Sequence, residues 1–437
     1  MNMPPSMDQR VQHRDNALIS VDAAITDMFR LHETLQLAGP SPNELLQMPD
    51  EVLLWLIAIL SGREPISPDI TASTWQQLLE LLKPHWIMPL LYWNIGHLPH
   101  LCQPSPDILA CLRNSFLESN VRLLQKGRHL KNIIAALEAR GIRLLAAKGF
   151  ALAHTVYPHP AARPFDDIDL IIRPEDFLQA RTILEDIGFR AQTHRFELLQ
   201  EILFEEKMFY DSGTGDTLLI ELHWYPHKSF GTQRVIDVDE LFNRSDKIKT
   251  AELTFMALDM VDALIYAALH MLLHHTRDIR LSWIYDITML AHKITAAENW
   301  EAVQKRSADL GAVLAIQSAL ELARFWTGLK IPDRFSGSSA WPEPSEDEEK
   351  TFHQALKKQF RPYVLLKQYL SGAPTGGKKM MLLLQLIFPA PSYMRRNYSL
   401  DKKTFLPLLY CRHYCHWIEE FMESLKGFIK RKGRGVR

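Results

Sequence analysis

Three aspartates stand close together immediately before an apolar run in the stretch ARPFDDIDLIIRPEDF. Asp166, Asp167 and Asp169 lead into a Leu-Ile-Ile sequence, which is typical of a strand that enters a hydrophobic core. Carboxylates this close together repel one another unless a cation joins them. A purely structural strand does not need such a cluster, so the sequence predicts a place for positive charge at this point of the chain.

Residues two apart in a strand point to the same side. Asp167 and Asp169 therefore share one face of the predicted strand DIDLII, whereas Asp166 precedes it and is expected in a turn. In a second predicted strand, LLIELHW, Glu221 and His223 share a face in the same way. If the two strands are neighbours, Asp167, Asp169 and Glu221 converge on one point, and three such carboxylates suit Mg²⁺ or Mn²⁺. A purely structural role is the alternative for each residue. Asp167 and Asp169 could be acids of a turn or a helix N-cap before a strand, and Glu221 could be an ion-paired residue on an edge strand.

A second motif, LLAAKGFALAHTVY, lies upstream of the acids. Its predicted strand ends at Lys148 and Gly149, and a helix begins at once. Gly149 allows the backbone to turn tightly and approach a ligand, and the helix N-terminus offers unpaired N–H groups to a phosphate, with added charge from Lys148. Arg163 precedes Asp167 closely enough to reach a phosphate, or equally to neutralise the acids when no metal is bound. These features together predict a site for a metal ion and a nucleoside triphosphate.

Hydrophobic periodicity predicts an α+β chain in three regions. The regions are a helical segment over 1–125, an α+β core over 126–246 and a helical segment over 247–437 that ends in a basic tail. In the core, KMFYDS and TLLIELHW are predicted to form a hairpin around a turn at Gly213–Gly215. The polar, Pro- and Ser-rich stretch 333–350 is predicted to be a surface loop.

The composition is that of a globular protein with a large core. The chain has 437 residues, 47% of them hydrophobic, and a formal net charge of -1. A near-zero charge argues against nucleic acid as a partner. The N-terminus lacks the apolar core of a secretory signal, and the apolar runs are shorter than the roughly 20 residues of a transmembrane helix. We therefore expect a cytoplasmic protein without a transmembrane segment.

The motifs, taken in order, resemble the uncharacterised nucleotidyltransferase family of bacterial gene clusters, within the DNA polymerase beta-type nucleotidyltransferase superfamily. The resemblance is carried by KGFALAHTVY, R-x-x-x-D-I-D-L-I-I, IELHW and LHMLLHHTRDIRLSWIYDI. It implies a small mixed sheet as nucleotidyltransferase core, with helical regions on both sides. The superfamily pattern is Gly-Ser on a strand-to-helix turn, then acid-x-acid, then a third acid on a later strand.

Carried over to this chain, the pattern assigns Lys148 and Gly149 to the Gly-Ser position. Asp167 and Asp169 correspond to the metal-binding pair and Glu221 to the third carboxylate. The chain departs from the pattern in having Lys-Gly in place of Gly-Ser and a longer gap to the acids. This departure concerns the contact with the triphosphate and leaves the acid triad intact.

A later helical motif holds further candidates. His270 and His274 have the i, i+4 spacing of half a zinc site, but no adjacent acid or cysteine supplies the other ligands. The resemblance instead implies that His270, His274, Arg280 and Asp286 belong to a helical element beside the active site, where they bind the triphosphate or the acceptor. A buried polar network that holds the helices together is an equal alternative. His223 could orient a carboxylate or contact the nucleotide, and a hydrogen bond to a backbone group is the simpler account.

The function implied by the resemblance is transfer of a nucleoside monophosphate from ATP or another NTP to a hydroxyl or phosphate acceptor, with release of pyrophosphate. Asp167, Asp169 and Glu221 would hold Mg²⁺ or Mn²⁺, and catalysis would come from positioning and charge neutralisation. The acceptor is an unidentified small molecule, peptide or protein. The alternative is a non-catalytic module that binds Mg-NTP or a partner protein. The feature that supports this alternative is the presence of Lys-Gly where the superfamily has Gly-Ser.

Overall fold

A computed structural model of the chain describes most of its central part. It covers residues 45–356 with gaps at 47, 64, 66–69, 100–102, 192–203, 212–216, 226–235 and 276–278, and then residues 405–415 and positions 377, 380, 384, 388 and 394. The first 44 residues of the predicted helical region, the predicted turn at Gly213–Gly215 and the basic tail lie outside the described residues. No helix in the described part of the chain is both long enough and apolar enough to cross a membrane.

The chain divides into two compact units, each assembled from separate stretches of sequence. The first unit comprises Met1–Ile134, Leu145–Ile168 and His227–Lys357, and the second comprises Ala135–Leu144, Asp169–Pro226 and Lys358–Arg437. The boundary therefore falls inside the strand that carries the acid-x-acid motif, between Ile168 and Asp169.

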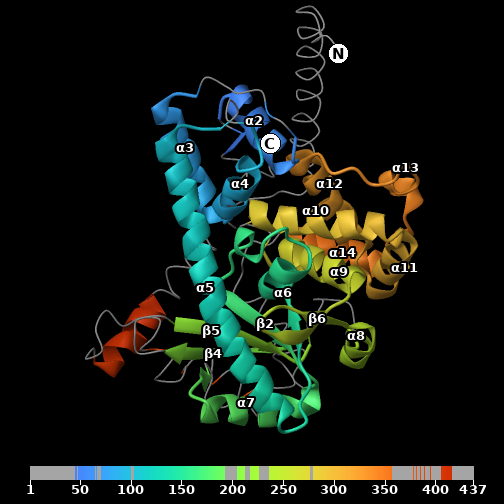
Figure 1. The fold of residues 1–437 in the computed structure, drawn as a ribbon. Coiled ribbons are helices and arrows are strands. Elements are labelled where there is room, and N and C mark those ends of the chain that lie inside the picture. Colours follow the sequence, from blue (N-terminus) through green and yellow to red (C-terminus); the bar gives the residue numbers. More distant parts are fainter. Residues whose placement is uncertain are drawn as a thin grey trace, which may run out of the picture. The chain divides into compact units, whose positions relative to one another are not determined.

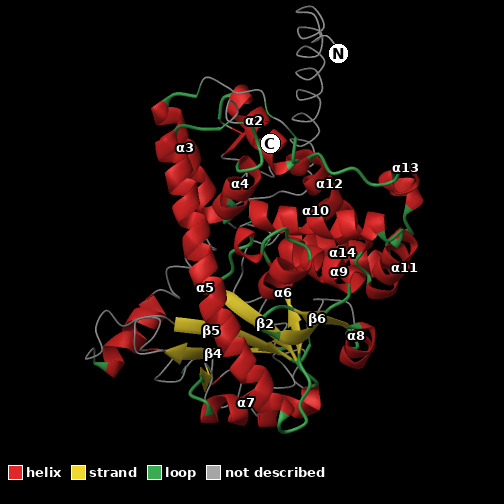
Figure 2. Cartoon of the chain, in the orientation of Figure 1, coloured by secondary structure: helices red, strands yellow, loops and turns green. Residues whose placement is uncertain are grey.

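The strands, drawn as arrows in Figure 1 and in yellow in Figure 2, form one mixed sheet, and their order is β3-β4-β5-β2-β1-β7-β6. Their bounds are β1 Leu145–Ala147, β2 Asp167–Ile171, β3 Arg190–Ala191, β4 Glu205–Asp211, β5 Thr217–His223, β6 Asp246–Lys249 and β7 Thr254–Ala257. β1 runs parallel to β7, while β4 and β5, and likewise β6 and β7, are antiparallel pairs. The expected α+β class, with a mixed sheet and mainly helical flanks, is confirmed. The two acid-bearing strands β2 and β5 are neighbours, which is the condition that the convergence of their acids required.

The strands of the second unit have one apolar face and one polar face. On β5, Ile220, Leu222 and the following Trp224 are fully buried, as the period-two alternation predicts. The Trp224 ring lies 4.5 Å, centroid to centroid, from that of Phe177, the first residue of helix α7 (Phe177–Asp186). Since α7 covers the apolar face, Glu221 and His223 project from the opposite face of β5.

The first unit is mainly helical. Its buried part is built on α9 (Met260–Leu269), α10 (Leu281–Ala296) and α12 (Val313–Thr327). The Asp259 carboxylate caps α9 by accepting N–H bonds at 2.8 Å from residues 261 and 262. Further helices are α2 (Asp50–Leu60), α3 (Ala72–Leu82), α4 (Met88–Ile95), α5 (Pro106–Glu138), α6 (Lys148–Thr155), α8 (Val238–Arg244), α11 (Trp300–Leu310), α13 (Asp333–Ser336) and α14 (Glu346–Leu356). The last turn of α5, from residue 135 on, belongs to the second unit.

The predicted surface loop over 333–350 is wrong. This stretch contains α13, a single 3₁₀ turn at Ser338–Ala340 and the start of α14. Phe335 and Trp341 are buried, and the Trp341 indole N–H donates to the Phe335 carbonyl at 2.9 Å. The polar composition of the stretch concealed two aromatic residues, whose burial outweighs the preference of the surrounding Ser and Pro for irregular structure.

Candidate active site

Two carboxylates and an imidazole meet on the polar face of β2 and β5. Asp169, Glu221 and His223 each offer a ligand atom, and these atoms all lie within 4.8 Å of one another. His223 Nε2 is 2.9 Å from Asp169 Oδ1 and 3.7 Å from Glu221 Oε2. All three side chains are at least nine-tenths buried. Period-two alternation brings the residues of each strand to one face, and the adjacency of the strands brings the two sets together.

The neighbouring strand β4 supplies two further charged groups. Lys207 stands directly opposite Glu221 and Glu205 opposite His223 in the β4–β5 register. The Lys207 ammonium lies 2.6 Å from Glu221 Oε1. Neither residue was predicted from the sequence, although the sequence contains a signal for both. If a hairpin turns at Gly213–Gly215, two residues at equal distances from position 214 stand opposite each other. This rule pairs Lys207 with Glu221 and Glu205 with His223.

The cluster needs positive charge, because taking a carboxylate out of water costs several kcal/mol unless it is paired. Lys207 satisfies part of this need at Glu221, and His223 is hydrogen-bonded to Asp169. His223 Nδ1 lies 3.4 Å from a Glu205 carboxylate oxygen, yet it is buried without a hydrogen bond. Two buried carboxylates with an adjacent imidazole form a donor set that fits a divalent cation, with the oxygen ligands favouring Mg²⁺ or Mn²⁺.

Asp167 begins β2 and is half-buried, and it is not one of the three residues that share the cluster. Asp166 precedes the strand in a bend and is exposed, as its predicted turn position requires, with an ion pair to Arg122 at 3.8 Å. A lysine that sequence reasoning missed lies beside both acids. Lys126 donates to the Phe165 carbonyl, and its ammonium lies 4.8 Å from the centre of the Phe165 ring.

Burial lowers the pKa of Lys126 to about 8, against the opposing effect of Asp166 and Asp167, which raise it. The ammonium therefore offsets the negative charge at the start of β2. No local pattern indicates this role, because Lys126 reaches Phe165 across 39 positions of sequence.

The strand-to-helix turn forms where it was predicted. β1 ends at Ala147, and α6 begins at Lys148 without a side-chain hydrogen bond at its N-cap, Ala147. The first N–H groups of an α-helix have no acceptor within the helix, which makes a helix N-terminus a common place for phosphate. Lys148 has a φ of 47°, a left-handed conformation that costs a residue with a side chain of order 1–3 kcal/mol. Its ammonium lies 5.5 Å from the centre of the Tyr266 ring.

Gly149 is required by packing. A Cβ added there would lie 2.7 Å from Phe165 Cβ, which is closer than real side chains approach. We expect Gly149→Ala to lower the free energy of unfolding by about 1–3 kcal/mol through overpacking. Gly127, inside helix α5, has nothing within 4 Å of the corresponding position, so Gly127→Ala should instead stabilise by about 0.5–1 kcal/mol. Urea unfolding of both variants checks this pair, and equal effects of the two substitutions would contradict it.

Arg163 and Asp286, two of the predicted ligand-binding residues, form a buried bidentate ion pair. Arg163 Nε and Nη2 lie 2.7 Å from the two Asp286 oxygens, and the Tyr157 hydroxyl donates to Asp286 at 2.6 Å. Burial alone would lower the pKa of Arg163, but the Asp286 charge outweighs it and raises the pKa. Burial and then Asp286 hold the pKa of Tyr157 well above its usual range. In this structure the pair links the 160–163 turn to α10 within the first unit.

Two of the remaining predicted residues, His270 and His274, lie on a distorted helix end, and the third, Arg280, directly precedes α10. His270 and His274 bound a π-helical turn, with their rings 6.0 Å apart. A single π-helical turn is rare and frequently occurs at functional sites. Arg280 stacks on Trp86, with its guanidinium 4.0 Å from the ring centre, and it lies 5.0 Å from that of Trp283.

A mixed sheet that carries buried acids beside an imidazole is an arrangement suited to metal-dependent phosphoryl chemistry. The family model described as uncharacterised nucleotidyltransferase matches residues 71–328, more than half of the chain. The protein therefore belongs to the uncharacterised nucleotidyltransferase family, and the resemblance noted from its motifs is confirmed.

No curated protein matches the chain. Among solved structures, the chain is similar to an antigenic nucleotidyltransferase-like protein from Paracoccidioides brasiliensis. The two are 15% identical, the match covers 41% of this chain and 90% of that chain, and the TM-score is 0.25.

Proposed function

We propose that this protein is a metal-dependent nucleotidyltransferase that moves a nucleoside monophosphate from an NTP to an acceptor hydroxyl or phosphate and releases pyrophosphate. The observation that carries the proposal is the buried cluster of Asp169, Glu221 and His223 in a member of a nucleotidyltransferase family. Structural strands rarely bury two carboxylates on one face, because the desolvation must be offset by a cation or by hydrogen bonds.

Asp169 and Glu221 would hold the cation, with Asp167 as the other member of the acid-x-acid pair. Mg²⁺ or Mn²⁺ bound there would neutralise phosphate charge and lower the pKa of the acceptor hydroxyl. His223, hydrogen-bonded to Asp169 at 2.9 Å, fixes the orientation of that carboxylate. Lys207 holds Glu221 in place when no cation is bound. The uncapped N-terminus of α6 and Lys148 would bind the triphosphate through N–H groups and charge.

Arg163 and Asp286 have a different role in this proposal. Their bidentate pair and the Tyr157 hydroxyl position the turn that leads to the acids, so they support the site without touching the phosphates. His270, His274 and Arg280 remain candidates for contact with the triphosphate or the acceptor.

One observation favours the non-catalytic module as a second candidate. Glu221 is already paired with the Lys207 ammonium at 2.6 Å, and Asp169 is already hydrogen-bonded to His223 at 2.9 Å, so both carboxylates have partners within the protein itself. A protein of this kind would bind Mg-NTP weakly or without turnover.

Calorimetric titration tests the proposal. ATP, GTP, CTP and UTP are titrated into the parent protein with and without Mg²⁺ or Mn²⁺, and into the Asp167→Asn/Asp169→Asn variant. We expect metal-dependent binding of at least one nucleotide, weakened by 10-fold or more in the variant, because both acids of the motif are then neutral. If a folded parent binds none of the four nucleotides, the proposed function is wrong.

A further inference from the structure

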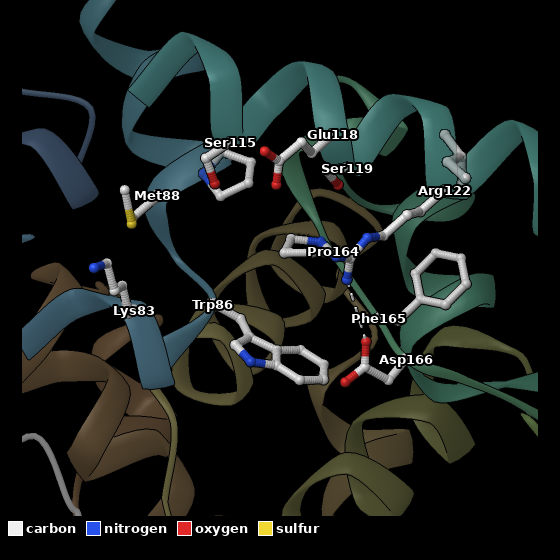
Figure 3. Close-up of a pocket in the computed structure, with 12 residues that line it drawn as sticks. Lys83, Trp86, Met88, Ser115, Glu118, Ser119, Arg122, Pro164, Phe165 and Asp166 are labelled. Carbon is white, nitrogen blue, oxygen red and sulfur yellow. Dashed lines mark ion pairs between the residues drawn. The ribbon is translucent and has the colours of Figure 1, made fainter. Parts of the chain in front are cut away.

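A cavity of about 210 Å³ opens beside the start of β2, with all of its lining residues in the first unit (Figure 3). Three segments form it: the turn between α3 and α4 together with the first two residues of α4, one face of α5, and residues 164–166. Its volume is below the roughly 300–1,000 Å³ of sites for drug-sized ligands, so it suits a molecule of about one ring. The lining residues are Lys83, Trp86, Met88, Pro89, Ser115, Glu118, Ser119, Arg122, Leu123, Pro164, Phe165 and Asp166.

Trp86 provides a rigid aromatic surface on one side of the cavity. It has a φ of 54°, in the left-handed region, at the end of the 3₁₀ turn Lys83–His85. The preceding His85 is buried, and its Nδ1 accepts the Leu281 N–H at 3.4 Å, which anchors the turn. Arg280 stacks on the Trp86 ring at 4.0 Å and is not among the residues that line the cavity. The ring is therefore held in place before any ligand arrives.

The opposite wall is a polar stripe on α5. Ser115, Glu118, Ser119 and Arg122 recur at three- and four-residue spacing, so they share one face of the helix, as Figure 3 shows. Ser115 and Ser119 bring hydroxyls that both donate and accept hydrogen bonds. The stripe therefore places two hydroxyls, a carboxylate and a guanidinium in the wall of the cavity that Trp86 also lines.

The lining residues carry charges of both signs, and Lys83 is already paired with Glu80, which does not line the cavity. Lys83 and Arg122 are cationic, and Glu118 and Asp166 are anionic. The Arg122–Asp166 pair is long, at 3.8 Å, and both side chains are more than half exposed, so it contributes little and can be exchanged for contacts with a ligand. A wall with both signs of charge favours a ligand that carries many hydroxyls and little net charge over a strongly anionic one.

We propose that this cavity binds the acceptor, and that the acceptor is a polyhydroxylated ring compound of the carbohydrate class, stacked on Trp86. The apolar C–H face of such a ring matches the electron-rich face of an indole, and its hydroxyls match Ser115, Ser119 and the two carboxylates. The inference rests on the proposed nucleotidyltransferase function, because Asp166, in the cavity wall, directly precedes Asp167 of the acid-x-acid motif.

The reaction balances with the NTP as the only co-substrate. An acceptor hydroxyl loses its proton to solvent, and its oxygen forms a bond to the α-phosphorus. The bond from that phosphorus to the oxygen bridging to the β-phosphorus breaks, and pyrophosphate leaves with the electron pair. The products are a nucleotidylated carbohydrate and pyrophosphate.

Saturation-transfer NMR on the full chain tests the proposal, with the methyl glycosides of glucose, galactose, mannose and glucosamine and with myo-inositol as probes. We expect at least one probe to bind the parent and to lose 10-fold or more in affinity in Trp86→Gly, which tolerates the left-handed backbone, and in Ser115→Leu, which fills the cavity. Asn114→Leu is the matched control, because it places the same side chain on the exposed part of α5 next to the stripe, and it should bind as the parent does.

The outcomes separate this inference from the proposed function. Glycoside binding that depends on Trp86 and Ser115, in a protein that binds no Mg-NTP, would support the carbohydrate site and reject the transferase. No binding of any probe at high millimolar concentration would overturn the carbohydrate site. The proposed carbohydrate site would also be overturned if Trp86→Gly weakened Mg-ATP binding and left glycoside binding unchanged, because Trp86 would then belong to the nucleotide site.

Discussion

Asp169→Asn is expected to lower metal-dependent pyrophosphate release by about 100-fold or more, because it removes a central carboxylate ligand from the site. Asn has nearly the same shape, so the loss would reflect charge and not packing. His223 is hydrogen-bonded to Asp169 at 2.9 Å and can still bond to the amide, which should keep the fold intact. The measurement is an enzyme-coupled pyrophosphate assay with Mg²⁺ or Mn²⁺ and the nucleotide identified by calorimetry.

Asp186→Asn is the matched control for this prediction. Asp186 is an exposed aspartate at the end of α7 in the same unit, and its neutralisation should change the rate less than twofold. Circular dichroism checks that both variants are folded. If the parent releases pyrophosphate and the folded Asp169→Asn variant releases it at the same rate, the cluster has no part in the mechanism. A parent that binds Mg-NTP without releasing pyrophosphate would establish the non-catalytic module.

Asp286→Asn is expected to cost about 3–5 kcal/mol of unfolding free energy, the largest stability effect that we predict for a single substitution. It would leave Arg163, which is 4% exposed, as a buried cation without its bidentate carboxylate. The Tyr157 hydroxyl would lose its anionic acceptor as well. Urea unfolding monitored by tryptophan fluorescence measures the effect.

A double substitution makes this prediction specific to the buried charge. Arg163→Met/Asp286→Leu removes both charges, and it should be less destabilised than Asp286→Asn, because no unpaired ion remains in the interior. Glu321→Gln, which breaks an exposed ion pair with Arg324 in the same unit, should cost less than about 1 kcal/mol. A double variant as unstable as the single one would mean that packing around these side chains, and not their charge, carries the stability.

The local parts of the candidate site could be predicted from the sequence. Strand period places Glu221 and His223 on one face and Leu222 on the other, and the turn at Lys148 and Gly149 follows from a short apolar run that meets a helical pattern. These features depend on neighbours a few positions apart, whose geometry is determined by the backbone alone.

Other parts were decided only by tertiary structure. From the sequence alone, Arg163 and Asp286 were each predicted to bind a ligand. In the structure they form an ion pair with each other, although they are 123 positions apart in the chain. Lys126 reaches Phe165 across 39 positions, and the cavity wall at Trp86 depends on Arg280 from a distant helix end. The physical reason is that buried charges are paired wherever the fold brings them together, and periodicity contains no information about which distant segments meet.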